Sequence, residues 1–312
     1  MLWVIRMGVS QKFTDLFLSH RGKAVDKWEQ YLQVYDREFS ALVATGRPLR
    51  LLEIGVQNGG SLELWSKFLP AGSEIRGIDI DPRVSSLEFE SKNTRVDIAD
   101  ATDSIRLEEI LGSERFDIII DDASHVCEKV RQSFEILFPH LSLGGHYVIE
   151  DLACSYDSNY GGGLKSPGSS IEYLKHLVDC LHSDYLRADA ADADSVNSLS
   201  PYDRVLGRIS FYDSIAIIEK LSYEKTQPYQ RILGGDAASV QPLSNWIPLF
   251  STSDVQKLLF ARPAVHQFKQ AFFSELEQRR GEVSSLLSKI AELSTEVEQL
   301  RASLNARNRV PD

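Results

Sequence analysis

Short apolar runs alternate with amphipathic stretches through most of the chain, a pattern that is typical of α/β folds. The runs Leu51 to Val56, Phe116 to Asp121 and His146 to Ile149 are bounded by charged or turn-forming residues. Continuous apolar runs of this length indicate strands that are buried on both faces of a parallel sheet. We therefore predict a doubly wound, Rossmann-like sheet, to which EIRGIDID adds a strand that ends at Asp79.

Helices are expected before this sheet. Residues 11–48 are predicted to be helical, because Trp28, Tyr31 and Tyr35 recur at three- and four-residue spacing. An aromatic stripe of this kind usually forms core or a surface on which a helix docks. His20 precedes the stripe in LSHRGK, and we expect this segment to close over a site as an amino-terminal lid, with His20 as a candidate substrate contact.

The pattern after residue 151 is less regular. The stretch LACSYDSNYGGGLKSPGSS is rich in glycine and serine and contains Tyr156 and Tyr160. Long loops of this kind tend to be functional or disordered, and we interpret this one as a substrate loop with both tyrosines as candidate contacts. Further on, two strand-like runs in GRISFYDSIAIIEK surround a turn at 212–214, which suits an antiparallel hairpin.

The carboxyl-terminal part follows a different pattern. Its apolar residues alternate three and four apart, at Val283, Leu286, Ile290, Leu293, Val297, Leu300 and Leu304. This spacing predicts a short coiled coil, and the choice of residues favours a parallel homodimer. The alternatives are one amphipathic helix folded back on its own chain, or docking to the coiled coil of another pathway protein. We therefore divide the chain into a helical lid at 1–48, an α/β domain at 49–224, an extension at 225–274 and a coiled coil at 275–308.

Polar side chains follow two of the apolar runs. Asp122 and His125 come after one run, and Glu150 and Asp151 come after another. If these strands are neighbours, their carboxyl ends lie about 5 Å apart, at the edge where open α/β sheets bind ligands. The three carboxylates would repel each other unless a cation, most simply Mg²⁺ or Mn²⁺, neutralised them. We predict that Asp122, Glu150 and Asp151 bind a metal; the alternative is that these acids only cap a helix or begin a solvated loop.

A glycine-rich turn follows the first strand in RLLEIGVQNGGSLELWSKFL. Gly55 and Gly59 permit close backbone approach, and the start of the next helix, which carries Ser61, offers free N–H groups to an anion. Asp79 stands where an acid holds ribose hydroxyls in Rossmann-like domains. These features predict a nucleotide-type ligand. Dinucleotide enzymes share the geometry, but their G-x-G-x-x-G fingerprint is missing and Glu53 stands inside the strand end.

Four motifs, LLEIGVQNGGS, GIDIDP, FDIIIDDASH and GGHYVIED, occur in this order and together resemble class I S-adenosylmethionine-dependent methyltransferases. More narrowly, they resemble the metal-dependent sugar O-methyltransferases of the mycinamicin and macrocin type. The resemblance implies a seven-stranded sheet, S-adenosylmethionine and Mg²⁺ or Mn²⁺ as cofactors, and a methyltransferase domain at 49–224. The cofactor contacts that we expect are Glu53, Gly55, Gly59, Ser61, Asp79, Asp100 and Asp121.

The resemblance also assigns chemistry to the acid cluster. The family's metal ligands map onto Asp122, Glu150 and Asp151, and its general base maps onto His125. The implied reaction transfers a methyl group from S-adenosylmethionine to a sugar hydroxyl, which the metal orients and acidifies while the imidazole accepts the proton. Ala123 stands where relatives often have glycine, and the glycine turn lacks an insertion of the macrolide enzymes. The alternative role of His125 is to pack or cap at a helix start.

Composition limits the classes of partner. The net charge of −11 argues against nucleic acid or an anionic membrane, and no apolar run is long enough to span a bilayer. We expect a cytoplasmic enzyme with a sugar-containing acceptor and with three reduced, unpaired cysteines. Two other functions stay open: a nicotinamide-dependent oxidoreductase on a related fold, and a non-catalytic scaffold that binds S-adenosylmethionine and organises a glycan biosynthesis complex.

Overall fold

The computed structural model describes residues 12–184, 202–225, 229 and 289. The chain divides into two compact units, 1–228 and 229–312, and the helices and strands discussed here belong to the first. The predicted extension at 225–274 and the coiled coil at 275–308 fall almost entirely outside the described residues. Dimerisation through a coiled coil therefore stays a prediction.

A mixed β-sheet forms the centre of the first unit. Its strands are β1 (Arg50–Ile54), β2 (Glu74–Asp79), β3 (Thr94–Ile98), β4 (Phe116–Asp121), β5 (Leu141–Ile149), β6 (Leu206–Tyr212) and β7 (Ile215–Lys220). They form a seven-stranded sheet in the order β3-β2-β1-β4-β5-β7-β6. The strands β1 to β5 pair in parallel, and β7 runs antiparallel to both β5 and β6. The predicted Rossmann-like sheet and its closing hairpin are confirmed.

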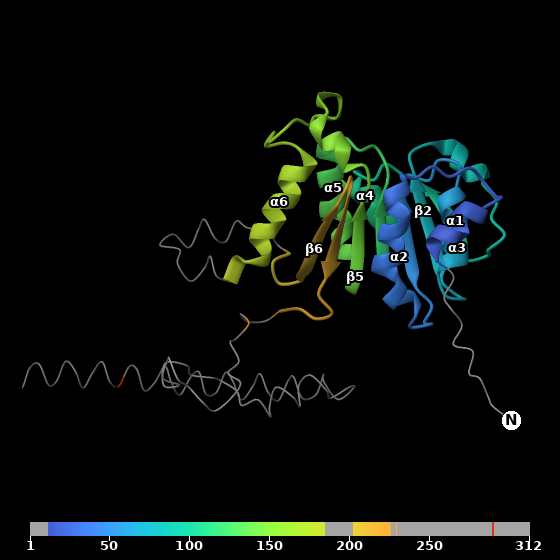
Figure 1. Cartoon of the computed structure of the whole chain (residues 1–312), viewed down its shortest axis with the longest axis horizontal. Helices are drawn as coiled ribbons and strands as arrows, with labels where there is room; N and C mark the ends of the chain where they lie inside the picture. Colours follow the sequence, from blue (N-terminus) through green and yellow to red (C-terminus); the bar gives the residue numbers. More distant parts are fainter. Residues whose placement is uncertain (1–11, 185–201, 226–228, 230–288, 290–312) are drawn as a thin grey trace, which may run out of the picture. The chain divides into compact units, whose positions relative to one another are not determined.

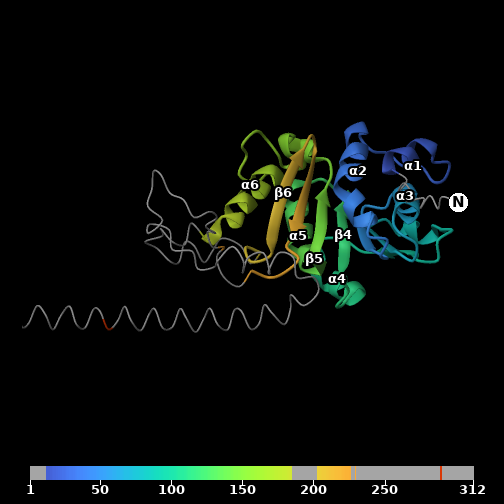
Figure 2. The same cartoon turned by 60° about the horizontal axis from the view of Figure 1, so that its bottom comes forward.

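Helices cover both faces of this sheet (Figures 1 and 2). They are α1 (Phe13–Ser19), α2 (Glu29–Val43), α3 (Gly60–Phe68), α4 (Ser104–Leu111), α5 (Cys127–Leu137) and α6 (Ser170–Leu181). Successive residues of a strand point to opposite faces. Leu51 and Ile118 therefore join α1, α2 and α3 in one apolar cluster, whereas Leu52 and Ile119 join α4, α5 and α6 in the other. The sheet is buried on both faces, as the continuous apolar runs predicted.

The predicted helical region before the sheet contains two helices, α1 and α2, with a non-helical segment between them. We call this segment, residues 20–28, the strap. Tyr31 and Tyr35 are fully buried, as expected for the aromatic stripe, but Trp28 precedes α2 in an extended conformation and is 59 % exposed. The prediction of continuous helix over 11–48 is therefore wrong at the strap.

Close packing explains the course of the strap. A Cβ atom on Gly60 would lie only 2.4 Å from the carbonyl oxygen of Lys23, so the strap lies directly against the first turn of α3. The side chain of Lys23 also pairs with Glu63 of α3, at 2.6 Å between Nζ and Oε1. The non-helical strap makes these contacts with both its backbone and a side chain.

One strand is longer than predicted. The strand β5 begins at Leu141, so Gly144 and Gly145 lie within it and not in a turn before it. A Cβ atom on Gly145 would lie 2.9 Å from the carbonyl oxygen of Asp117 on β4, which shows why a residue without a side chain is needed there.

Two further expectations concern thiols and membranes. None of Cys127, Cys154 and Cys180 is joined in a disulfide, in agreement with the reduced thiols expected from their odd number and irregular spacing. Within the part of the chain that is described, no helix has the length and apolar character needed to cross a bilayer.

Candidate functional site

A cavity of about 710 Å³ opens where the carboxyl ends of β1, β2 and β4 meet. Its wall consists of the glycine turn after β1, the end of β2, the segments that follow β3 and β4, and residues 24–27 of the strap. Ligands of open α/β sheets bind at this edge. The cavity therefore brings together the glycine turn and the acid-bearing strand ends that the sequence singled out.

The glycine turn needs its glycines for steric reasons. Gly55 has a φ of 92°, and a Cβ atom there would lie 2.1 Å from the carbonyl oxygen of Asp122. Gly59 has a φ of 81° and is the N-cap residue of α3. Gly55 lines the cavity together with Gly60 and Ser61, whereas Gly59 is not among the lining residues. The turn thus places bare backbone between the cavity and the loop after β4.

Two predicted acids, Asp79 and Asp100, line the cavity. The carboxylate of Asp79 accepts hydrogen bonds from the N–H groups of Val56 and Gln57, at 2.8 and 2.9 Å, so it holds the glycine turn in place. A hydrogen bond from the backbone of Thr102 is the main cause of a lowered pKa of Asp100. Both acids are placed to accept hydrogen bonds from a ligand's hydroxyl or amino groups.

Two other predicted acids are buried beneath the cavity. Glu53 is inaccessible and does not line the cavity, but it accepts a hydrogen bond at 2.9 Å from Ser61, which does. Asp121 is 3 % exposed and lines the cavity next to Ser133, whose hydroxyl donates to it. Burial raises the pKa of each carboxyl to about 7. Both acids therefore support the cavity floor at the cost of a buried ionisable group.

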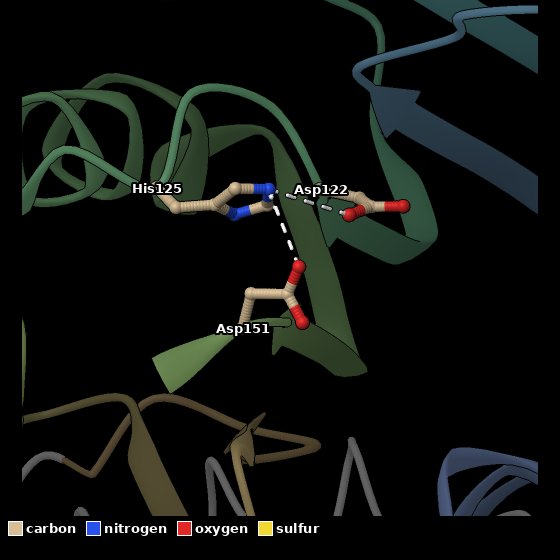
Figure 3. Close-up of side chains that lie close together, drawn as sticks. All are labelled: Asp122, His125 and Asp151. Carbon is tan, nitrogen blue, oxygen red and sulfur yellow. Dashed lines mark ion pairs between the residues drawn. The ribbon is translucent and has the colours of Figure 1, made fainter. Parts of the chain in front are cut away.

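Asp122, His125 and Asp151 converge on one point (Figure 3). Their ligand atoms lie within 4.8 Å of one another, with His125 Nε2 at 3.4 Å from Asp151 Oδ2 and 3.9 Å from Asp122 Oδ1. Asp122 follows β4 and Asp151 comes just beyond β5, its parallel neighbour, so the sheet itself brings the two acids together. Two carboxylates and an imidazole form a donor set that can hold a divalent cation.

Asp151 is held by α2. It has a φ of 54°, which is a costly conformation for a residue with a side chain. The Tyr31 hydroxyl accepts the N–H of Asp151 at 2.9 Å, and Oδ1 of Asp151 accepts from Trp28 Nε1 at 2.9 Å. His125 also has a positive φ, of 55°. Strained backbone at two members of one cluster indicates that the surrounding structure is built to hold this geometry.

Glu150, the third predicted metal ligand, points elsewhere. Its carboxylate is 2.8 and 2.9 Å from Nζ of Lys27 and also accepts from the Tyr35 hydroxyl. Lys27 contacts Asp122 as well, and its Nζ lies 3.8 Å from Oε1 of Glu53. The structure therefore groups Asp122 and Asp151 with His125, and it groups Glu150 with a lysine of the strap.

Lys27 is a residue of this site that sequence reasoning missed. It stands in the polar stretch AVDKWEQ, and its spacing does not distinguish it from a solvated lysine. Burial alone would lower the pKa of Lys27, but the carboxylates of Glu150, Asp122 and Glu53 outweigh burial and raise it. Burial is also the main cause that raises the pKa of Glu150, although Lys27 opposes it. The lysine is a charged group held among acids in the interior.

The predicted substrate residues lie outside the main cavity. Tyr156 ends the short 3-10 helix η3 (Leu152–Tyr156) and is 52 % exposed, and Tyr160 ends η4 (Ser158–Tyr160). His20 borders a separate cavity of about 370 Å³, and its Nε2 lies 2.9 Å from the carbonyl oxygen of Lys23. Of the expected lid, the part that reaches the main cavity is 24–27, not His20.

Comparison with known proteins identifies relatives of this domain. No family model matches the chain. It is 35 % identical to mycinamicin VI 2''-O-methyltransferase of Micromonospora griseorubida and 38 % identical to demethylmacrocin O-methyltransferase of Streptomyces fradiae. Each match covers 60 % of this chain and 47 % of the relative. The chain thus spans about half the length of the curated relatives that it matches.

A solved structure agrees with these relatives. MycE methyltransferase from the mycinamycin biosynthetic pathway, in complex with Mg and SAH, superposes with a TM-score of 0.60 at 30 % identity, over 79 % of this chain and 60 % of MycE. A complex of MycE with Mg, SAH and mycinamycin VI matches with a TM-score of 0.53, at 30 % identity over 66 % of this chain and 53 % of MycE. The resemblance drawn from the four motifs is confirmed: the described domain has the Rossmann-like methyltransferase fold of MycE, and its relatives are sugar O-methyltransferases of the mycinamicin and macrocin type.

Proposed function

We propose that this chain transfers a methyl group from S-adenosylmethionine to a sugar hydroxyl with the help of a divalent cation, Mg²⁺ or Mn²⁺. One observation carries the proposal. The cluster of Asp122, His125 and Asp151 lines the same cavity as the glycine turn and Asp79. A methyl donor in the cavity and an acceptor at the cluster would then meet. The similar MycE structures were solved with Mg and SAH, which supports the same pair of ligands here.

The cavity suits an adenosyl ligand. Its volume of about 710 Å³ falls within the range of about 300–1,000 Å³ that small-molecule sites occupy. Gly55 leaves backbone exposed on the wall, where a Cβ atom would have no room. Asp79 and Asp100 are positioned as acceptors for hydroxyl and amino groups. These residues fit a ligand with a ribose and a base.

The cluster suits a hard cation. Asp122 and Asp151 each offer a carboxylate oxygen, and a cation held by these two carboxylates keeps positions for the oxygens of an acceptor while His125 Nε2 stays available as a base. When bound there, a divalent cation would lower the pKa of a chelated hydroxyl as a Lewis acid. Glu150 would join the ligand set only by giving up its contact with Lys27.

His125 is the proposed general base. It lines the cavity, and its side chain is 20 % accessible, so an acceptor can reach the imidazole. A proton taken up at Nε2 would face Asp151 at 3.4 Å and Asp122 at 3.9 Å, and these carboxylates would stabilise the imidazolium. The remaining proposed roles are those of Tyr156 and Tyr160, which follow Asp151 in the chain and would contact the acceptor from the segment after β5.

A calorimetric titration tests the proposal without knowledge of the acceptor. The full-length, metal-stripped protein is titrated with S-adenosylmethionine, S-adenosylhomocysteine and NAD⁺, each with and without Mg²⁺. We expect both adenosyl ligands to bind and NAD⁺ not to bind. Binding of NAD⁺ alone would favour an oxidoreductase, and absence of all binding would refute the proposal.

Turnover separates an enzyme from a scaffold. The protein is incubated with S-adenosylmethionine, Mg²⁺ and a panel of deoxysugar and rhamnosyl glycosides, and S-adenosylhomocysteine is measured. Methylation that is lost in Asp122→Asn and His125→Ala variants, both of which still bind the cofactor, would support catalysis. Methylation that is undiminished in both variants would contradict the assigned roles. The cytoplasmic location and the coiled-coil dimer stay predictions from the sequence.

A further inference from the structure

Lys27 brings a positive charge from the strap into the acid cluster at the ends of β4 and β5. Its side chain is 2 % exposed. Its ammonium contacts Asp122, lies 2.8 Å from Oε1 of Glu150 and lies 3.8 Å from Oε1 of Glu53. Within the described residues, Lys27 is the one lysine or arginine that pairs with any of these three carboxylates. The imidazole of His125 faces Asp122.

The carboxyl groups here outnumber the single ammonium, so protons or a further cation must neutralise the remaining charge. Three carboxylates surround one ammonium, and two of them, Glu53 and Glu150, are at most 3 % exposed. A buried carboxylate without a partner is strongly destabilising. Lys27 therefore supplies, from within the chain, part of the neutralisation that a metal ion would supply from solution.

Asp122 belongs to both groups of residues. Its Oδ2 contacts Lys27, while its Oδ1 faces His125 Nε2 at 3.9 Å in the cluster with Asp151. A divalent cation bound to Asp122 would stand next to the Lys27 ammonium inside the protein, where screening by water is weak. Two positive charges that share one carboxylate there repel each other more strongly than they would in water.

We propose that Lys27 and the divalent cation compete for Asp122 and Glu150, so that cation binding displaces the Lys27 ammonium from the cluster. This inference rests on the metal dependence proposed above. It has a consequence for the cofactor site, because Lys27 and its neighbours 24–26 line the cavity. Occupancy of the metal site would thus alter the wall that faces the methyl donor.

Titration of variants with Mn²⁺ tests the competition. The full-length, metal-stripped wild type is compared by calorimetry with Lys27→Met, which removes the ammonium and keeps an apolar side chain of similar length. We expect Lys27→Met to bind Mn²⁺ at least about tenfold more tightly, a difference of about 1.4 kcal/mol. Lys23→Met is the matched control, because Lys23 lies on the same strap but pairs with Glu63, outside the cluster. Its affinity for Mn²⁺ should equal that of the wild type.

The outcomes separate this inference from the proposed function. If the wild type binds Mn²⁺ and Lys27→Met binds it equally or more weakly, competition is refuted while the metal site stands. If neither protein binds Mn²⁺, the metal-dependent function itself fails, and the inference fails with it.

A second measurement needs only the wild type and so does not depend on the folding of a variant. The protein is treated with a small acetylating reagent, and modification of each lysine is followed by mass spectrometry with and without saturating Mn²⁺. We expect Lys27 to be protected without metal and to react several-fold faster with it, while Lys23 changes little. Equal protection of Lys27 in both conditions would overturn the proposal.

Discussion

Replacement of Asp121 by asparagine should stabilise the protein at alkaline pH and leave its stability unchanged at acid pH. Asp121 lies at the end of β4, is 3 % exposed and accepts a hydrogen bond from Ser133. Burial raises its pKa from 3.8 to about 7, and the hydrogen bonds from Ser133 and Ala123 offset this only in part. Asparagine has nearly the same shape and carries no charge, so it removes the cost of burying the ionised form.

The sign and size of the expected change in unfolding free energy follow from proton linkage. Because the folded-state pKa lies above the ordinary value, the native state holds a proton between about pH 4 and pH 7 that the unfolded state has lost. The contribution of this carboxyl to stability is therefore full below pH 4 and is lost as the pH rises to 7. The difference between 3.8 and about 7 corresponds to roughly 4 kcal/mol, and relaxation of the site reduces the expected gain at pH 8 to about 2–4 kcal/mol.

Urea unfolding measures this difference. Wild type and Asp121→Asn are unfolded in the presence of a chelator at several pH values from 4 to 8.5, and the difference in unfolding free energy is plotted against pH. Effects of other titrating groups are common to both proteins and cancel. Asp213→Asn, which removes an exposed carboxylate in the turn between β6 and β7, is the matched control. A flat line for Asp121→Asn would refute the argument from burial.

Three further perturbations test the site and its support. His125→Ala should lower the rate of methyl transfer by about 10²–10⁴-fold while calorimetry shows unchanged cofactor affinity, as expected for loss of a general base; weakened cofactor binding would instead indicate a structural role. Gly55→Ala should destabilise the domain by more than about 2 kcal/mol and abolish cofactor binding in a titration, because a Cβ atom would lie 2.1 Å from the Asp122 carbonyl oxygen at a φ of 92°. Arg76→Met should lower the unfolding free energy by about 1–3 kcal/mol, because the 6 % exposed Arg76 gives up pairs with Asp97 at 2.7 Å and Glu114 at 2.9 Å, although Glu114 keeps two other arginine partners; a melt that matched the wild type would contradict this.

The local pattern of apolar residues was sufficient to predict most of the strands. The apolar runs predicted to end at Asp79 and Asp121 are strands that end at these residues. Short apolar runs between turn residues are typical of strands that a parallel sheet buries on both faces. The glycine turn was also recognisable, since a positive φ at Gly55 excludes most other residues. The sequence analysis assumed that the strands before Asp122 and Asp151 are neighbours. β4 and β5 do pair in parallel, and this brings the two acids together.

Periodicity was insufficient where contacts across the fold decide the local conformation. The region before the sheet was predicted as helix, but the strap is not helical, and it packs on Gly60 and pairs through Lys23 with Glu63. Trp28 shares the spacing of the buried tyrosines, yet its ring stays exposed while its Nε1 donates to Asp151. The periodicity of apolar residues indicates which side of a helix is buried, but it does not indicate at which residue the helix begins.

The division of the acids between Lys27 and the cluster with His125 was decided by tertiary structure alone. In the sequence, Glu150 and Asp151 are adjacent and look equivalent, but in the fold their carboxylates point to different partners, Lys27 and the cluster with His125. Lys27 lies 123 residues before Glu150, so no local spacing predicts their contact. A buried charge finds its partner through the packing of the whole chain, because the energy of an ion pair depends on distance in space and on exclusion of water.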